Sequence, residues 1–332
     1  MITYVVGVIT VGFISSVLVL GLNVRWGWAG EFDLAYYAFV AIGAYVAGVL
    51  IGGPSAGIVP PPDGWILGLH WPFLLAVPVA MLVSGIISLG LGAVALRKLR
   101  GDYFAITTVA FTYITIAFFS QEFQLFNGFN GVYNVPQPFS VALSNLSVDQ
   151  YGFFFMFLCL AILLVVYWVM TLFYRSPFGL TLRAIREDEQ AAAAFGRGVY
   201  MYKLKAYFLG GLVAGLGGAL YVVYLTSWDP SAWSAFETFL LFAAIFIGGQ
   251  ANTRGVILGA FIIVAVIPEL TRFLPNVPGH PDLFSAIRNI VIGILILLVL
   301  RFRPMGIIPE PRPRDARIEV GEGRGAEIST HA

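Results

Sequence analysis

Residues 151–174 read YGFFFMFLCLAILLVVYWVMTLFY, an unbroken apolar run without a charged side chain. In a helix, about 20 apolar residues cross the ~30 Å hydrocarbon core of a bilayer. Backbone polar groups in that core must be bonded within the protein, so a continuous run of this length favours a helix over a barrel strand, which alternates and spans ~10 residues. Similar runs lie at Tyr4–Leu22, Leu34–Ile51, Trp71–Leu96, Tyr103–Phe119, Ala206–Leu225, Phe236–Gly249, Gly255–Leu270 and Leu283–Leu300.

The composition agrees with a chain whose solvent is lipid. Of its 332 residues, 59% are hydrophobic and 11% are charged, whereas a soluble domain has about 25% charged residues. We therefore predict an all-α polytopic membrane protein, a helical bundle of about 8–10 transmembrane helices with room for re-entrant or broken helices. The two candidates for irregularity are Phe236–Gly249, which rises only about 21 Å as a helix, and Gly255–Leu270, which contains Pro268.

Small residues recur at four-residue spacing within several runs. Such spacing lets helices approach closely in lipid, so we expect tight helix packing at these positions. They are Ser84, Ser88, Gly92, Gly211, Gly215, Gly255 and Gly259.

The placement of basic residues predicts the orientation, because cytoplasmic connections are enriched in Lys and Arg. If every run crosses and the N-terminus is outside, all Lys and Arg residues except Arg272 and Arg288 fall on the cytoplasmic side. The external connections 52–70 and 120–150 then contain no basic residue. If 236–249 fails to cross, this orientation holds only if a second segment fails as well, and 255–270 is the first candidate.

The sequence lacks the residues that several functional classes require. The net charge of +1 gives no reason to expect a nucleic-acid partner, and one cysteine (Cys159) and three histidines leave no disulfide, cofactor or metal cluster to expect. No G-x-x-x-x-G-K-[ST] motif is present, so ATP hydrolysis would need another polypeptide. The G-x-S-x-G match at 53–57 lies in a Gly/Pro-rich connection rather than between a strand and a helix. We predict that the chain is not an enzyme.

Five acidic residues lie near membrane depth: Asp33, Asp102, Glu122, Glu237 and Glu269. A charge inside the bilayer is costly and is therefore a functional candidate. The first four lie at segment ends, where we expect the carboxylates to reach headgroups or water. For Glu269 we expect an ion pair with the arginine three residues later, and a gate or substrate contact is the alternative.

The connection 175–205 reads RSPFGLTLRAIREDEQAAAAFGRGVYMYKLK. Pro177 favours a helix start, an apolar stripe and a charged patch follow, and Gly196 favours a helix stop. We expect a short helix, held between two spans, whose shape suits docking into a groove on a partner. The alternative is an ordinary solvated helix.

This connection closely resembles the cytoplasmic coupling loop of the permeases of branched-chain amino acid ABC importers. The likeness runs from Gly179 to Gly196. Other stretches are similar to the M-type subunit of that family: LRGDYFAI at 99–106, FIGG at 246–249, RGVILGA at 254–260, PE at 268–269 and RPMGI at 303–307. The resemblance extends from about Trp26 to Ile308.

The resemblance implies a place in a five-part importer of a bacterial plasma (inner) membrane. An external substrate-binding protein captures the amino acid, two different permease subunits form the path, and two cytoplasmic ATP-binding-cassette ATPases drive alternating access. This chain would be one permease subunit. The residues whose role would be to insert into an ATPase are Gly179, Arg183, Arg186, Glu187, Asp188, Glu189, Ala192 and Gly196.

The substrate is less well defined, because the chain departs from the family in two places. The family usually has Thr-Gly-Gly where this chain has 127–132, and Met where it has Phe195. We expect branched-chain or other neutral amino acids, with urea or short amides as an alternative and an ion-coupled secondary transporter as the alternative outside the family. Candidates for the substrate path along the sister subunit are Asn127, Asn130, Gly248, Gly249 and Glu269.

The resemblance also divides the chain. Residues 1–308 would form the transmembrane permease domain, with the coupling loop at 175–205. Residues 309–332 are polar with mixed charge, and we expect a disordered cytoplasmic tail. The external connections 52–70 and 120–150 would face the binding protein.

Overall fold

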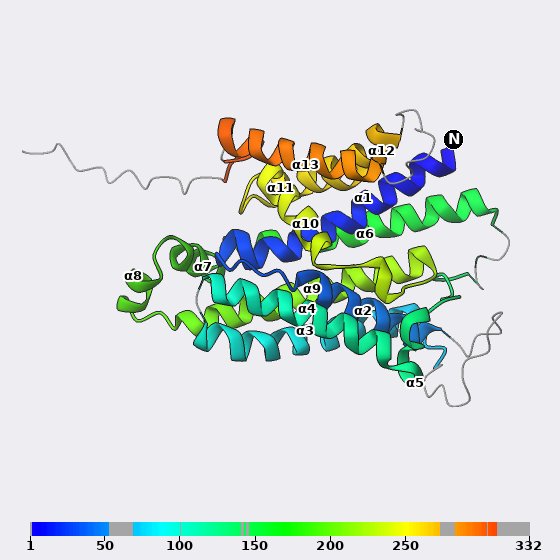
Figure 1. Ribbon diagram of the computed structural model, residues 1–332, viewed down its shortest axis with the longest axis horizontal. Helices are drawn as coiled ribbons and strands as arrows, with labels where there is room; N and C mark the ends of the chain where they lie inside the picture. Colours follow the sequence, from blue (N-terminus) through cyan, green and yellow to red (C-terminus); the bar gives the residue numbers. More distant parts are fainter. Residues whose placement is uncertain are drawn as a thin grey trace, which may run out of the picture.

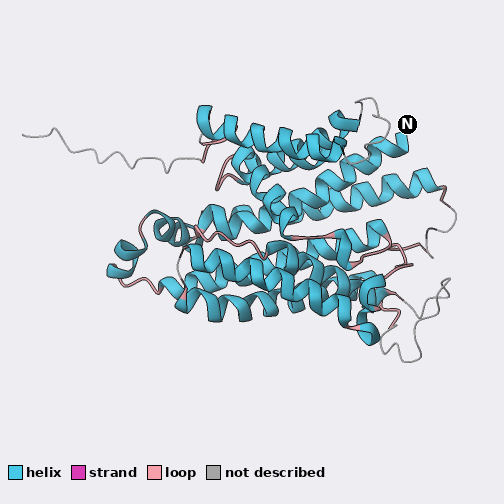
Figure 2. Cartoon of the chain, viewed as in Figure 1, coloured by secondary structure: helices cyan, strands magenta, loops and turns pink. Residues whose placement is uncertain are grey.

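The computed structural model describes residues 2–52, 69–99, 101–140, 143, 146–272, 283–303 and 305–310. In this part of the chain nearly all regular structure is helical, and most helices run along the long axis of the molecule (Figure 1 and Figure 2). The predicted all-α polytopic fold is confirmed. The G-x-S-x-G match and residues 311–332 of the expected tail lie outside the described residues.

The helices coincide with the predicted apolar runs. Five are long and apolar enough to cross a membrane: α1 (Ile2–Asn23, continued by the π-helical η1, Val24–Trp28), α3 (Phe73–Lys98), α4 (Asp102–Gln121), α6 (Val148–Arg175) and α9 (Val199–Leu225). Three other helices carry shorter apolar stretches: α2 (Tyr36–Ile51), α10 (Ala235–Gly248) and α13 (Leu283–Phe302). Short helices lie between them: α5 (Phe123–Phe126), η2 (Gly128–Asn130), α7 (Pro177–Glu187), α8 (Glu189–Ala194) and η3 (Pro230–Ala232).

The predicted run 255–270 is an interrupted helix. It consists of α11 (Thr253–Ala260), the π-helical η4 (Phe261–Val266) and α12 (Ile267–Arg272). Pro268 lies at the start of α12 and has no N–H to donate to the preceding turn. A π-helical insertion of this kind is often found at functional sites.

The centre of the bundle is packed through small residues. α9 contacts α1, α2 and α3. A methyl group added at Gly211 of α9 would lie 2.5 Å from Cβ of Ser88 on α3, and one added at Gly259 of α11 would lie 1.9 Å from the carbonyl oxygen of Ala244 on α10. These contacts leave no room for a side chain, so the small residues at four-residue spacing bring helices together as predicted.

The outer faces are apolar. Large exposed hydrophobic side chains line α3, α4, α6 and α13; Leu74, Ile114, Trp168 and Leu297 are examples. In Figure 1, α13 lies along one side of the bundle, and α3 and α4 lie along the opposite side. Such faces suit contact with lipid or with a second membrane chain.

The two ends of the bundle differ. α7 and α8 project from one end, which we call the α7–α8 end, and the N-terminus and α5 lie at the other, the N-terminal end (Figure 1). α3, α6 and α13 end at the α7–α8 end, and α4 and α9 begin there. The basic residues of those helix ends, such as Arg97, Arg175 and Arg301, therefore belong to one end of the molecule.

Two non-helical segments pair beside α2. Val132 and Trp228 exchange backbone hydrogen bonds of 2.8 and 2.7 Å, and the N–H of Val135 donates to the carbonyl of Thr226 at 3.0 Å. A methyl group added at Gly48, near the end of α2, would lie 3.1 Å from the Val132 side chain. These segments therefore lie alongside α2 rather than beyond it.

Candidate functional site

The segment predicted as one coupling helix is two short helices joined at Asp188. α7 begins with Pro177, at a position where the missing N–H is not needed. It ends at Glu187, and the next residue is Asp188, whose Oδ1 accepts hydrogen bonds of 2.9 Å from the N–H groups of Gln190 and Ala191. A side chain that caps a new helix in this way competes with continuation of the previous one. The expectation of a single helix is wrong for this reason, and α8 then stops before Gly196, whose φ is +75°.

The α7–α8 segment has one buried and one exposed face. Leu182 and Ile185 of α7 are buried against the bundle, and so is Ala192 of α8. Gly179 permits close packing on α6, because an added methyl group would lie 2.5 Å from two carbonyl oxygens of that helix. At the tip, the side chain of Phe195 is 85% exposed. The predicted residues Glu187, Asp188, Glu189 and Gly196 are exposed as well.

The two predicted arginines of α7 converge on a residue that sequence reasoning did not select, Glu310. Arg186 donates to Oε2 of Glu310 at 2.8 Å and to Oε1 of Glu187 at 2.9 Å. Arg183 lies 3.4 Å from Oε1 of Glu310 and donates to the hydroxyl of Tyr174 at 2.9 Å. Burial alone would lower the pKa of Arg186, but the hydrogen bonds to Glu310 and Glu187 raise it above its ordinary value. The guanidinium therefore stays charged and anchored.

A second ion-pair centre joins α8 to the bundle. Nζ of Lys203, in the first turns of α9, lies 2.7 Å from a carboxylate oxygen of Glu31 and 2.7 Å from one of Glu189. A cavity of about 450 Å³ adjoins these side chains and is also lined by Asp102 and Arg186. The α7–α8 segment is thus tied to the start of α9 and to the connection before α2.

The prediction that the Asp33 carboxylate reaches headgroups or water from its place at a segment end is wrong, because the fold buries it. Its carboxylate is paired with Arg25, and both side chains are 0% exposed. Arg25 also donates to Oγ of Ser88 at 2.6 Å and to the carbonyl of Tyr207 at 3.0 Å. Its guanidinium lies 4.4 to 5.1 Å from the ring centroids of three aromatic residues. The pair joins η1, α2, α3 and α9. The signal of it in the sequence is faint, namely two opposite charges eight residues apart in aromatic surroundings.

The other acidic candidates have different environments. Asp102 is exposed in the first turn of α4, in agreement with the prediction. Glu122 and Glu237 are partly exposed. Glu269 accepts a hydrogen bond from the hydroxyl of Tyr4 on α1. The side chain of Arg272, its predicted partner, lies outside the described residues.

The candidates for the substrate path do not form one site. Asn127 is buried in a left-handed conformation and donates from Nδ2 to the carbonyl of Gly131 at 3.0 Å, whereas Asn130 is exposed. Gly248 is the last residue of α10, and Gly249 begins the turn that leads to α11. Glu269 is on α12, which lies across the bundle from α5, the helix that precedes Asn127 (Figure 1). A path role for these residues stays a prediction.

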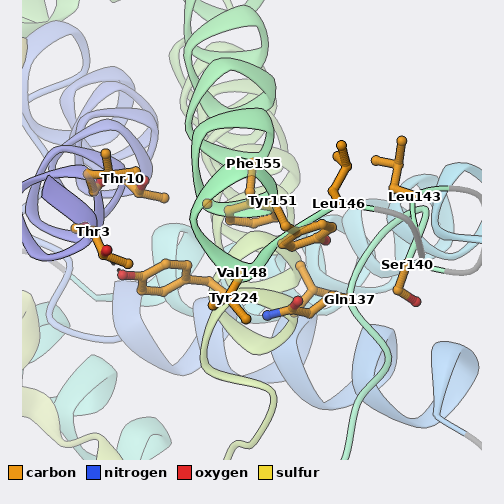
Figure 3. A pocket seen from close by; sticks show the side chains of 14 residues that line it. Thr3, Thr10, Gln137, Ser140, Leu143, Leu146, Val148, Tyr151, Phe155 and Tyr224 are labelled. Atoms are coloured by element: carbon orange, nitrogen blue, oxygen red, sulfur yellow. Dashed lines mark hydrogen bonds between the residues drawn. The ribbon is translucent and has the colours of Figure 1, made fainter.

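Two adjoining cavities lie at the N-terminal end. One of about 370 Å³ lies between α1, α6 and α9, and Figure 3 shows the Tyr224 hydroxyl in it pointing toward Thr3. Two hydroxyl groups that line this cavity already donate hydrogen bonds to backbone carbonyls. Thr10 donates to Val6 at 2.7 Å, and Tyr151 donates to Pro138 at 2.8 Å. The other, of about 350 Å³, is lined by Glu269. The first cavity offers apolar walls and neutral hydroxyls, and the second adds a carboxylate.

The fold is that of a polytopic helical membrane protein, with a charged, partly exposed helix pair at one end of the bundle. Residues 4–300 match the family described as "Branched-chain amino acid transport system / permease component". The chain belongs to this family, which confirms the resemblance inferred from the coupling loop. It is therefore a transport subunit and not an enzyme.

Individual relatives agree. The chain is 30% identical over 343 residues to the high-affinity branched-chain amino acid transport system permease protein LivM of Salmonella typhimurium, which covers 97% of this chain and 74% of that protein. It is 28% identical over 242 residues to a probable LivM of Methanocaldococcus jannaschii, and the match covers 70% of this chain and 68% of that protein. It is 24% identical over 309 residues to a probable branched-chain amino acid transport permease protein LivH of the same organism, covering 91% of each. No solved structure matches the chain significantly.

Proposed function

We propose that this chain is one of two different permease subunits of an ATP-binding-cassette importer that carries branched-chain or other neutral amino acids into the cytoplasm. Its similarity to relatives named LivM and, more distantly, LivH supports a sister permease of related fold. The remaining partners are two cytoplasmic ATPases and an external substrate-binding protein. The membrane is the bacterial plasma membrane, with the N-terminus outside and the α7–α8 end in the cytoplasm.

The observation that carries this proposal is the α7–α8 segment. It projects from the end where basic residues gather, as a cytoplasmic contact requires. It presents Phe195 beside a run of alanines, and an exposed aromatic residue over small neighbours is a common anchor at protein interfaces. The ion pairs of Arg186 with Glu310 and of Glu189 with Lys203 hold the segment on the bundle, so force applied to it reaches the helices.

The substrate path is proposed to follow the face that carries the paired segments near Asn130 and Trp228. Non-helical backbone at membrane depth is tolerated only where protein buries it or where it lines a water-filled space. Val132 and Trp228 are buried beside α2, whereas Asn130 is exposed. A sister subunit against this face would complete an interface with polar groups for a zwitterion.

Co-purification tests the partners. The tagged wild type and a Glu187→Ala, Asp188→Ala, Glu189→Ala triple variant are co-expressed with the neighbouring genes, and Asp149→Asn, at the N-terminal end, serves as the control. We expect the wild type and the control to retain two ATPases and the triple variant to lose them or their coupled uptake. Because Asp188 caps α8, Asp188→Asn is added to separate loss of the cap from loss of charge. A wild type that purifies alone and transports without ATP would contradict the importer assignment.

Cysteine labelling tests the orientation, since the only native cysteine, Cys159, is buried. Phe195→Cys and Val148→Cys place exposed thiols at opposite ends of the molecule. An impermeant maleimide should label Val148→Cys in intact cells and Phe195→Cys only after permeabilisation. Labelling of Phe195→Cys in intact cells, and of Val148→Cys only after permeabilisation, would show that the orientation is opposite to the proposed one.

Uptake by reconstituted complex tests the substrate class. Leucine should be taken up in an ATP-dependent manner, and other neutral amino acids should compete. ATP-dependent uptake of urea or acetamide that leucine does not inhibit would show that the substrates are short amides.

A further inference from the structure

The last described residues form a strap across the turn between α10 and α11. After α13 the chain turns at Gly306, whose φ of +76° favours glycine, and residues 305–310 run back along that turn. We call residues 305–310 the C-terminal strap. It includes Pro309 and Glu310, the first two residues of the predicted tail. Three hydrogen bonds hold it: Ile307 N to Ile247 O (2.8 Å), Ile308 N to Gly248 O (3.0 Å) and Asn252 Nδ2 to Pro309 O (2.7 Å).

The strap lies directly on the glycines of the turn. A methyl group added at Gly249 would lie 2.1 Å from the carbonyl oxygen of Ile308, and one at Gly306 would lie 2.4 Å from Cα of Gly249. Backbone atoms are in contact on both sides, with no flexible side chain between them. A displacement of the strap is therefore transmitted to the turn and to α11.

The far end of the strap is held by α7. The carboxylate of Glu310 contacts Arg186 at 2.8 Å and Arg183 at 3.4 Å, and it accepts a hydrogen bond of 3.2 Å from Tyr174 of α6. The side chains of the two arginines are 16% and 14% exposed, and that of Glu310 is 26% exposed. Exposed ion pairs contribute little, but a half-buried carboxylate held by two guanidinium groups and a hydroxyl is fixed in position.

We infer that Glu310 is a positioning residue that links the coupling segment to the α10–α11 turn through the C-terminal strap. When the ATPases displace α7, the arginines carry Glu310, and the strap moves the turn that leads into the interrupted helix α11–η4–α12. This inference rests on the proposed function, since it needs ATPases that act on α7. It adds a route for that motion that bypasses α9.

Spatial adjacency alone does not establish coupling, so the test measures motion at the turn. Spin labels are placed at Gln250→Cys in the turn and at Val148→Cys at the N-terminal end, in a Cys159→Ala background and in the complete complex. The distance between the labels is measured without nucleotide and with ATP trapped by vanadate. ATP hydrolysis and uptake of radiolabelled leucine are measured on the same preparations.

The informative variant is Glu310→Gln, which keeps the shape of the side chain and removes its charge. We expect ATP hydrolysis to remain, the ATP-dependent distance change to vanish, and leucine uptake per ATP to fall at least about five-fold, the lower end of the roughly 5- to 150-fold range of allosteric coupling. Arg97→Gln removes an exposed charge from the same end of the bundle and should change neither the uptake per ATP nor the distance between the labels.

A second variant tests the other end of the strap. Asn252 caps α11 and also donates to Pro309. Serine at this position still caps a helix but is too short for the second bond. Asn252→Ser should reduce uptake per ATP, and the double variant with Glu310→Gln should reduce it no further than Glu310→Gln alone.

The inference is overturned if Glu310→Gln shows the wild-type distance change and the wild-type leucine uptake per ATP. It is overturned as well if the variant loses hydrolysis and uptake in equal proportion, as general destabilisation would produce. It is also overturned if the wild-type turn does not move when ATP binds. Failure of the proposed function has a different signature: the wild type would then lack ATPases or would transport without ATP.

Discussion

The buried pair of Arg25 and Asp33 allows a quantitative prediction of stability. Both side chains are fully buried. Loss of one member of a buried ion pair leaves an uncompensated charge and costs about 3–5 kcal/mol. Arg25→Met also deletes the charged hydrogen bonds to Ser88 and Tyr207, and Asp33→Asn keeps the oxygen that accepts from the N–H of Ala35 at 2.9 Å.

The double variant is expected to cost no more than about 3 kcal/mol, because removal of both charges abolishes the desolvation penalty together with the attraction. If each single variant costs at least about 3 kcal/mol, the coupling free energy is at least about 3 kcal/mol. Asp33→Asn should be the more damaging single change, since an arginine cannot lose its charge whereas an unpaired carboxylate can take up a proton.

Unfolding in mixed detergent and SDS micelles, followed by tryptophan fluorescence, measures these free energies, and Trp26 and Trp28 beside the pair report on the site. Arg254→Met removes an exposed arginine and should leave the unfolding midpoint unchanged. Additive costs of the two single variants, or costs below about 1 kcal/mol each, would show that the charges are solvated and would refute the reasoning.

Three further predictions test other parts of the structure. Phe195→Ala should weaken binding of the ATPases by about 2 kcal/mol, roughly 30-fold, measured by titration of purified ATPase, and unchanged affinity would remove Phe195 from the interface. Gly211→Val should destabilise the bundle by about 1–3 kcal/mol in the same unfolding assay, whereas Gly90→Ala, which meets no atom within 4 Å, should be neutral; equal effects would exclude close packing as the cause. Ser147→Ala, which removes the capping box of α6, should cost about 1 kcal/mol, and Ser147→Asp should restore most of it; stability equal to that of the wild type would show that the cap does not support α6.

The sequence predicted the helices well because lipid leaves few alternatives to a helix in a long apolar run. The short length of Phe236–Gly249 and the presence of Pro268 in Gly255–Leu270 predict irregularity, and these segments form the short α10 and the interrupted α11–η4–α12. The small residues at four-residue spacing also predicted contacts, since Gly211 faces Ser88. These properties are local in the sequence, and therefore the sequence reveals them.

The missed features depend on contacts between distant segments. Asp33 at a segment end is ordinarily solvated, and only the fold shows that Arg25 and Ser88 enclose it. Glu310 lies in a polar stretch that composition assigns to a disordered tail, and its partners are more than a hundred residues away in the chain. The sequence identifies Asp188 as a charged residue of the coupling segment, but its role as a cap that divides the helix depends on its backbone conformation.

The two groups of charges have different consequences for motion. The Arg25–Asp33 pair is enclosed by three aromatic rings and four elements, so it can move only as a unit with α2, α3 and α9. The pairs at Glu310 and Lys203 are partly exposed and connect separate elements through long side chains. If the chain works as the proposed importer, alternating between two states, it needs one part of the bundle that keeps its packing and another whose contacts can be exchanged. The buried pair therefore belongs to the rigid part. The ion pairs around α7–α8 lie where relative motion costs least, and they are the first contacts to examine for a difference between the two states.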